Sequence, residues 1–191
     1  VVENAARFKD NPDFFRDAIA TIANSVNRMN RLLEQLTRGD ARAAVLPELV
    51  RLADVVDQAV GKCNGQMPVP QIRERDDTVR VRVAGEPFAA VLSHVIRNAQ
   101  QATAADGCVH VRMRREGSMA VVEIEDDGTG MDADFAANRL FRPFDSTKGS
   151  QGMGMGAYQT REFVRAAGGE VEVVTAPGEG TTFKISLPLH Q

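Results

Sequence analysis

The stretch VVEIEDDGTGM, residues 121–131, decides how this chain folds. Apolar and acidic side chains alternate along it, which predicts a β-strand with one face on a core and the other in water. Asp126 has the parity of Val122 and Ile124, so its carboxylate is expected to point towards the buried layer, whereas Asp127 points towards water. An inward carboxylate is costly unless a hydrogen-bond donor meets it. Asp126 is therefore a candidate binding residue.

The glycines that follow this strand allow a close approach of the backbone. Gly128 and Gly130 carry no side chain, so the chain can pass close to something flat. Taken alone, the same residues fit equally well a tight turn with a solvated aspartate. The interpretation as a site therefore depends on the rest of the sequence.

The neighbouring segments predict the layers around this strand. Residues 109–114 alternate in the same way and form a predicted hairpin with 120–125, while Gly85-Glu86-Pro87 introduces a helix expected over 86–104. The other predicted elements are helices over 48–62 and 155–167, extended segments over 70–75 and 79–83, and the strands EVEVVT and TTFKISL. The expected fold class is α+β, a two-layer sandwich in which a mixed sheet has helices on one face and water on the other.

A separate helix is predicted before this domain. Apolar residues recur every three or four positions over residues 13–37, which indicates one narrow apolar stripe that needs a covering partner. A helical hairpin or an intermolecular bundle would supply it. Gly39 and Pro47 are stop and restart signals, so we expect one domain over 1–40 and a second over 41–191.

The helix over 86–104 carries two polar residues one turn apart, His94 and Asn98. An asparagine carbonyl oxygen suits a magnesium ion that takes its other ligands from phosphates and water. A histidine four residues earlier could orient or deprotonate a nucleophile beside that metal. Spacing alone nevertheless favours an ordinary polar pair on a helix flank.

The loop FDSTKGSQGMGMG, residues 144–156, contains Gly152, Gly154 and Gly156. Its glycines match neither the Walker order nor the dinucleotide fingerprint. What remains is a loop that ends at a helix N-terminus, where backbone N–H groups attract phosphate, with Lys148 as a phosphate partner. The alternative is a flexible surface loop, although loops of this length are more often functional than idle.

Composition excludes several classes of protein. A net charge of −3 and a pI near 5.7 give no general attraction to nucleic acid or to an anionic membrane. No apolar run reaches the roughly 20 residues of a membrane span, and the start shows no signal-peptide pattern. Cys63 and Cys108 lack the spacing of a zinc site, so we expect free, reduced thiols. A cytoplasmic piece of a longer protein is expected, without direct membrane contact; any anchor of the parent lies elsewhere.

Five segments, taken in order, resemble the ATP-binding domain of the GHKL superfamily, specifically that of the sensor histidine kinases. The segment HVIRNAQQA resembles the N box, DDGTG the G1 box, FRPFDSTK the F box, GMGMG the G2 box and GEGTTF the last box. Each is weak alone, but the five occur in the right order over about half of the chain, which makes the match specific. The helix before residue 40 is similar to the second helix of a dimerisation and histidine phosphotransfer domain. The combination most resembles the kinases of PEP-CTERM protein-sorting systems.

The resemblance implies ATP and Mg²⁺ as cofactors and gives the base-binding and metal-binding residues their roles. Asn98 would ligate the metal, and Asp126 would accept a hydrogen bond from the adenine amino group. Gly128 and Gly130 would leave room for the base, and Thr181, which shares the inward parity of Phe183, would support the Asp126 end of the pocket.

The resemblance also implies an ATP lid over residues 132–152. Phe141 and Phe144 would anchor it, and Lys148 and Arg142 would lie near the phosphates. Gly152, Gly154 and Gly156 would hinge the lid and cradle the phosphates.

Two departures from the family pattern matter for the reaction. His94 lies at a position where these kinases often carry asparagine and where related ATPases of the superfamily carry a catalytic glutamate. A role of His94 as a base is therefore a hypothesis. None of the three histidines lies in the helical context of a phosphoacceptor, so this chain alone is predicted not to phosphorylate itself.

The expected function is the catalytic core of a two-component sensor histidine kinase. The intact protein would be a homodimer and its partner a response regulator, which accepts the phosphoryl group on an aspartate. The alternatives are a GHKL ATPase, a serine kinase directed at a regulatory protein, and a non-catalytic nucleotide-binding module.

Overall fold

The computed structural model describes residues 46–145 and 154–190, which belong to one compact unit. The helix expected over 13–37 lies outside the described residues, as do Lys148 and Gly152. In chain order the elements are β1 (Glu48–Arg51), α3 (Leu52–Gly61), β2 (Gln71–Glu74), β3 (Arg80–Val83), α4 (Gly85–Ala102), β4 (Val109–Glu116), β5 (Met119–Asp126), α5 (Ala133–Asn138), α6 (Gly156–Ala166), β6 (Glu170–Thr175) and β7 (Thr181–Pro188).

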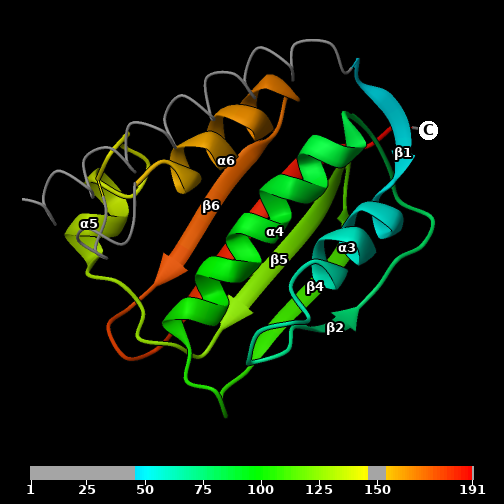
Figure 1. Cartoon of the computed structure of the whole chain (residues 1–191). Helices are drawn as coiled ribbons and strands as arrows, with labels where there is room; N and C mark the ends of the chain where they lie inside the picture. The colour runs from blue at the N-terminus through cyan, green and yellow to red at the C-terminus, as the bar shows by residue number, and fades with distance from the viewer. Residues whose placement is uncertain (1–45, 146–153, 191) are drawn as a thin grey trace, which may run out of the picture. The chain divides into compact units, whose positions relative to one another are not determined.

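The main sheet has five strands in the order β2-β4-β5-β7-β6. Strand β2 pairs in parallel with β4, and the other pairs are antiparallel, so the sheet is mixed. Helices α3, α4 and α6 lie on one face of it (Figure 1). The expected α+β sandwich with helices on one face is confirmed.

Side-chain alternation places the core between the sheet and the helices. The inward positions of β4 and β5 are buried, among them Val111, Met113, Val122 and Ile124. Across the helical layer, Phe88 of α4 stacks on Phe163 of α6 with ring centroids 5.6 Å apart. This packing fixes α4 and α6 side by side, and the candidate site lies where these two helices and β5 meet.

The prediction of a helix over 48–62 is wrong at its start, because Glu48–Arg51 form strand β1. The apolar spacing of Leu49, Leu52 and Val56 continues through both elements, so periodicity does not separate them. Strand β1 pairs antiparallel with β3, with Glu48 opposite Val83 and Arg51 opposite Arg80. This pairing to a distant segment overrides the local helical pattern.

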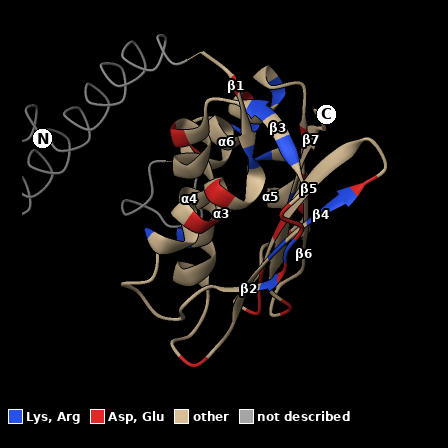
Figure 2. Cartoon of the chain, turned by 90° about the vertical axis from the view of Figure 1, so that its right-hand side faces the viewer, with Lys and Arg blue, Asp and Glu red and all other residues tan. Residues whose placement is uncertain are grey.

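The outer face of the sheet is charged, as the hairpin pattern predicts (Figure 2). Arg114 lies 2.7 Å from Glu123, and Lys184 lies 2.9 Å from Glu116, so opposite charges alternate across neighbouring strands. Val121 belongs to this face by parity but is only 1% exposed. Its cross-strand neighbours are Arg114 and Ser186, so a long, ion-paired arginine stands beside it.

Candidate functional site

Asp126 ends β5 with its side chain buried at 6% exposure, as its parity predicts. Its Oδ1 accepts a hydrogen bond from the Gly128 N–H at 3.0 Å. Burial raises the pKa of this carboxyl, although the backbone N–H groups of Gly128 and Thr181 act in the opposite direction. These two N–H groups use only part of the acceptor capacity of a carboxylate, so Asp126 can also accept from a donor on a ligand.

The turn after Asp126 is wedged between two other backbone segments. A Cβ on Gly128 would lie 2.5 Å from the Ala102 carbonyl oxygen at the end of α4. A Cβ on Gly130 would lie 1.9 Å from the Ala176 carbonyl oxygen, and Gly130 has a φ of +62°. The Thr129 N–H donates to Ala102 O at 3.0 Å, which ties the turn to α4. The protein backbone therefore requires both glycines before any ligand is considered; the prediction that they leave room for a base stays a prediction.

The structure brings His94 together with the first residue of α6. A Cβ on Gly156 would lie 1.6 Å from His94 Nε2, so the imidazole occupies the space that a side chain there would need. Asn98, one turn further along α4, is half-buried, and its amide makes no hydrogen bond within the described residues. Met155 gives α6 no side-chain cap. The imidazole of α4 and the N-terminus of α6, which has no side-chain cap, thus lie together, and Asn98 lies one turn further along α4.

We expect Gly156→Ala to cost more free energy of unfolding in the natural chain than in a His94→Ala background. The added methyl group displaces the imidazole only where the imidazole is present. Urea unfolding of the four chains should give a coupling free energy of about 0.5–2 kcal/mol. A coupling near zero would mean that His94 turns away freely and that its contact with α6 is incidental.

Hydrogen bonds hold Phe144 and Asp145, the last two residues before the undescribed segment 146–153. Phe144 N–H donates to Gly154 O at 3.1 Å, and a Cβ on Gly154 would lie 2.3 Å from Asp145 O. Arg139 holds the Asp145 carboxylate through two hydrogen bonds, of 2.9 and 2.7 Å. Phe144 and Gly154, which lie on either side of residues 146–153, are therefore tied to each other.

The two predicted lid anchors behave differently. Phe141 packs against the core, and the Arg161 guanidinium lies 4.7 Å from its ring centroid. Phe144 is 53% exposed and has a φ of +66°, so its prediction as an anchor is wrong. Its backbone N–H bonds to Gly154 O, while its side chain is exposed. Arg142 is exposed beside these residues.

Thr181 is 6% exposed and lies opposite Asp126 across the β5–β7 pair, as predicted. Sequence reasoning missed Thr175, the last residue of β6, whose hydroxyl contacts Thr181 Oγ1 at 3.0 Å. Its inward parity with Val171 and Val173 was the available signal. Helix α5 was also missed, although Asp132 marks its start as an N-cap that accepts from Asp134 N and Phe135 N.

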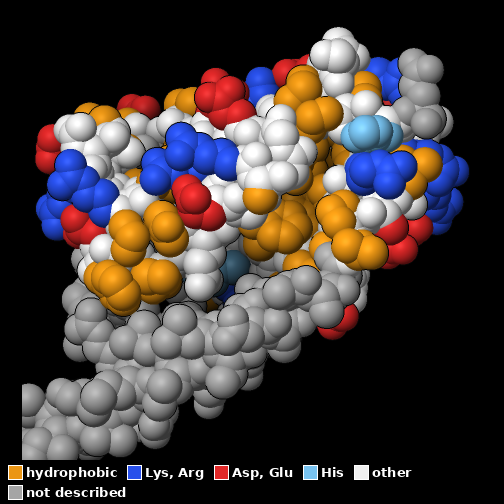
Figure 3. Space-filling view, turned by 90° about the horizontal axis from the view of Figure 1, so that it is seen from above, with side chains coloured by type: hydrophobic (Ala, Val, Ile, Leu, Met, Phe, Trp, Pro, Cys, Tyr) orange, Lys and Arg blue, Asp and Glu red, His pale blue; other side chains and the backbone are white. Residues whose placement is uncertain are grey.

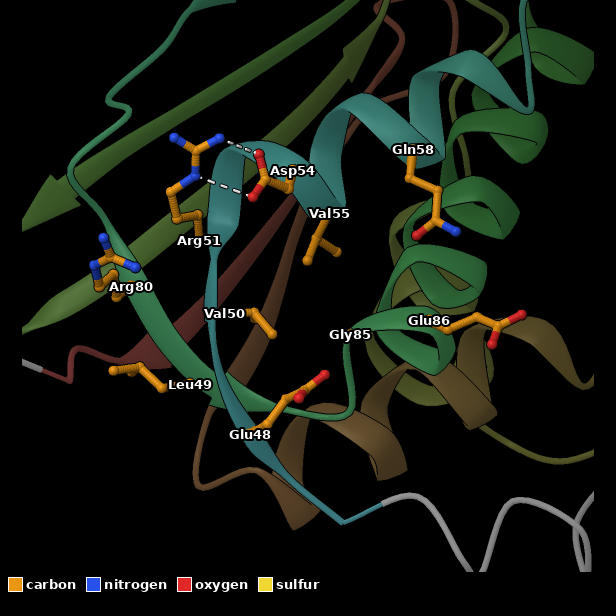
Figure 4. Close-up of a pocket in the computed structure, with 10 residues that line it drawn as sticks. All are labelled: Glu48, Leu49, Val50, Arg51, Asp54, Val55, Gln58, Arg80, Gly85 and Glu86. Carbon is orange, nitrogen blue, oxygen red and sulfur yellow. Dashed lines mark hydrogen bonds and ion pairs between the residues drawn. The ribbon is translucent and has the colours of Figure 1, made fainter.

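A separate groove of about 530 Å³ lies at the N-terminal end of α4, whereas the Asp126 turn contacts the C-terminal end of that helix (Figure 4). Residues from β1, α3 and the start of α4 line it, and the Arg51–Asp54 ion pair spans part of its wall. Figure 3 shows apolar and charged side chains interleaved over this end of the domain. The groove contains none of the predicted site residues and no buried polar group, so it is not the candidate site.

The described residues contain no cluster of three or more His, Cys, Asp or Glu side chains that would hold a metal ion by itself. None of their helices has the length and apolar character needed to cross a membrane. Cys63 is buried and Cys108 exposed, and both are free thiols, as expected.

The chain is similar in sequence to named sensor kinases. It is 26% identical over 180 residues to the signal transduction histidine-protein kinase AtoS of Escherichia coli (strain K12), which covers 92% of this chain and 29% of AtoS. It is 29% identical over 189 residues to the sensor kinase CckA of Brucella abortus (strain 2308), which covers 89% of this chain and 20% of CckA. The chain thus spans less than a third of these relatives.

Solved structures show the same fold. The mycobacterial sensor histidine kinase MprB superposes with a TM-score of 0.67 at 21% identity, over 76% of this chain and 99% of the MprB chain. The catalytic domain of the histidine kinase ThkA superposes with a TM-score of 0.63 at 18% identity, over 74% and 95% of the two chains.

The sequence pattern of a family described as histidine kinase-, DNA gyrase B- and HSP90-like ATPase matches residues 84–191, more than half of the chain. The matched region contains α4, the Asp126 turn, the Gly154–Gly156 segment and the β6–β7 pair, which are the parts that build the candidate site. The chain therefore belongs to the family of histidine kinase-, DNA gyrase B- and HSP90-like ATPases.

Proposed function

We propose that this chain is the ATP-binding catalytic core of a two-component sensor histidine kinase. The observation that carries the proposal is the buried Asp126 carboxylate, which ends β5 beside the helix that presents His94 and Asn98. Membership of an ATPase family supports ATP as the ligand. Similarity to proteins named as sensor kinases supports phosphoryl transfer to a histidine.

The Asp126 end of the site would bind the adenine base. A buried carboxylate with few internal donors is a strong acceptor for an exocyclic amino group. Thr181 would support it from the neighbouring strand. Gly128 and Gly130 would let the base lie flat against the turn, in addition to their packing role.

The other end of the site would bind the phosphates and Mg²⁺. The described residues provide no acidic cluster, so a metal here would take most ligands from phosphates and water, with Asn98 as its ligand from the protein. Bound Mg²⁺ would supply charge neutralisation at the phosphates. Gly154 and Gly156 at the start of α6, with Arg142, Lys148 and Gly152, would complete the cradle.

His94 would act beside the phosphates as a base or as an orienting group. Its Nε2 faces the backbone of Gly156, so a proton accepted by Nε2 would lie at the N-terminus of α6. Lys148 would contribute positive charge to the transfer. Phosphoryl transfer depends mainly on positioning and charge stabilisation, which is the contribution that these side chains can make.

The partners follow from the kinase proposal. The phosphoryl group would pass to a histidine outside this chain and then to an aspartate of a response regulator. The parent would dimerise through the helix predicted over 13–37. With a net charge of −3, no nucleic-acid partner is proposed.

Binding and transfer are tested separately. Calorimetric titration of this chain with ATP, with and without Mg²⁺, should show metal-dependent binding that Asn98→Ala weakens in the presence of Mg²⁺ and leaves nearly unchanged in its absence. A longer form of the natural protein that includes the proposed phosphoacceptor helix, the first helix of the dimerisation and phosphotransfer domain, should then take up label from γ-labelled ATP in an acid-labile, base-stable bond.

The outcome distinguishes the alternatives. Phosphate release without protein labelling would indicate an ATPase, and acid-stable label on a serine of a second protein would indicate a serine kinase. Binding without turnover in the longer form would indicate a nucleotide-sensing module. His94→Ala should reduce the labelling rate at saturating ATP by about 100-fold or more if His94 is a base, and an unchanged rate would exclude that role.

A further inference from the structure

Thr175 contacts three polar groups around the Asp126 turn. Its Oγ1 lies 2.9 Å from Met131 N, 2.9 Å from Gly180 O and 3.0 Å from Thr181 Oγ1. One hydroxyl at the end of β6 thus connects the turn after β5 with the turn that leads into β7. Strands β5 and β7 are neighbours in the main sheet, whose arrangement Figure 1 shows.

The direction of each hydrogen bond follows from counting protons. A backbone N–H can only donate, so Met131 donates to Thr175. A backbone carbonyl can only accept, so Gly180 O receives the single hydroxyl proton of Thr175. No proton of Thr175 remains for the third contact, so Thr181 is the donor there. Two lone pairs and one proton of Thr175 Oγ1 are then all used.

This direction has a consequence for Thr181. Its only hydroxyl proton is committed to Thr175, and it can therefore only accept from any ligand. Thr181 and Asp126 are cross-strand partners on the inward face, and each is 6% exposed. The two side chains at this end of the site are both acceptors.

We propose that Thr175 is a specificity-determining positioning residue, which orients the Thr181 hydroxyl so that the Asp126 end of the site accepts only a base edge that donates. This rests on the proposed function, in which the ligand is a purine with an exocyclic amino group, and adds the residue that enforces the preference for that group. A purine that lacks this group would meet two acceptors with no donor of its own.

The test compares ATP with purine riboside triphosphate, which differs by the missing amino group. Affinities of both are measured by calorimetry with Mg²⁺ on the natural chain, on Thr175→Val and on Thr175→Ser. The natural chain should bind ATP with roughly 10- to 100-fold higher affinity than purine riboside triphosphate, which corresponds to one hydrogen bond to a charged acceptor.

Thr175→Val keeps the shape and removes the hydroxyl. Thr181 is then free to donate, either to a ring nitrogen of the base or to Asp126, and both changes reduce the advantage of the amino group. The preference for ATP should fall about tenfold, and Thr175→Ser should keep it. Equal weakening of both ligands in Thr175→Val would overturn the proposal, because Thr175 would then only hold the turns together.

A second variant covers a Thr175→Val chain that does not fold, which circular dichroism would reveal. Thr181→Val removes the acceptor itself and should also lower the preference for ATP; an unchanged preference would overturn the proposal. Absence of ATP binding in the natural chain would instead contradict the proposed function. The two failures are therefore distinguishable.

Discussion

Asp126→Asn is expected to weaken ATP binding by roughly 10- to 100-fold, which corresponds to the loss of a hydrogen bond to a charged acceptor. Asparagine can still accept from the Gly128 N–H through its carbonyl oxygen, so the turn is kept. Its NH₂ group, however, presents hydrogens where the carboxylate presented lone pairs, and it would oppose an amino group of the base. Calorimetric titration with ATP measures the change.

The same substitution should not reduce the free energy of unfolding at neutral pH. Burial raises the pKa of Asp126 in the folded state above its unfolded value, so ionised Asp126 costs stability above the folded pKa. That cost disappears as the pH falls through the folded pKa towards the unfolded value. The stability gained by Asp126→Asn should therefore be largest at neutral pH and should shrink on acidification.

Asp127→Asn is the matched control for this prediction. Asp127 is exposed and its Oδ1 accepts from Cys108 N at 2.8 Å, outside the proposed base site. Its substitution should leave ATP affinity nearly unchanged. Equal losses of affinity in the two variants would mean that the turn as a whole matters and that the Asp126 carboxylate does not recognise the base.

Gly130→Ala is expected to destabilise the domain by about 2–5 kcal/mol. The left-handed backbone at Gly130 disfavours any side chain, and the added Cβ would collide with the Ala176 carbonyl oxygen, which belongs to backbone and cannot rotate away. The melting temperature should fall by about 10 °C for a domain of this size. Thermal unfolding followed by circular dichroism tests this.

Gly117→Ala separates the two causes. Gly117 has a φ of +57° in the β4–β5 hairpin, but a Cβ there would meet nothing within 4 Å. Gly117→Ala should reduce the free energy of unfolding only by the cost of a left-handed backbone at a residue with a side chain, about 1–2 kcal/mol. If Gly117→Ala and Gly130→Ala cost the same, the packing of the Asp126 turn against the β6–β7 turn contributes nothing to stability.

Local rules predicted most of what lies on single elements. Alternation along β5 placed Asp126 inwards and Asp127 outwards, and the helical repeat placed His94 and Asn98 on one flank of α4. These results follow because side-chain direction repeats with the element itself. Alternation failed at Val121, which is outward by parity but buried, with Arg114 opposite it on a neighbouring strand. The anchoring role of Phe144, which the family resemblance implied, failed because its side chain is exposed.

The sequence by itself determined the α+β class, the order of the family motifs and the inward position of the Asp126 carboxylate, because each depends on short-range periodicity or on local composition. Only the tertiary structure decided that Glu48–Arg51 is a strand, that His94 lies against Gly156, and that carbonyl oxygens of α4 and of the β6–β7 turn fill the space beside Gly128 and Gly130. It also decided that the Thr175 hydroxyl lies 2.9 Å from Met131 N, 44 residues earlier in the chain. Each of these depends on the distance between segments far apart in the chain, which packing sets and local pattern does not.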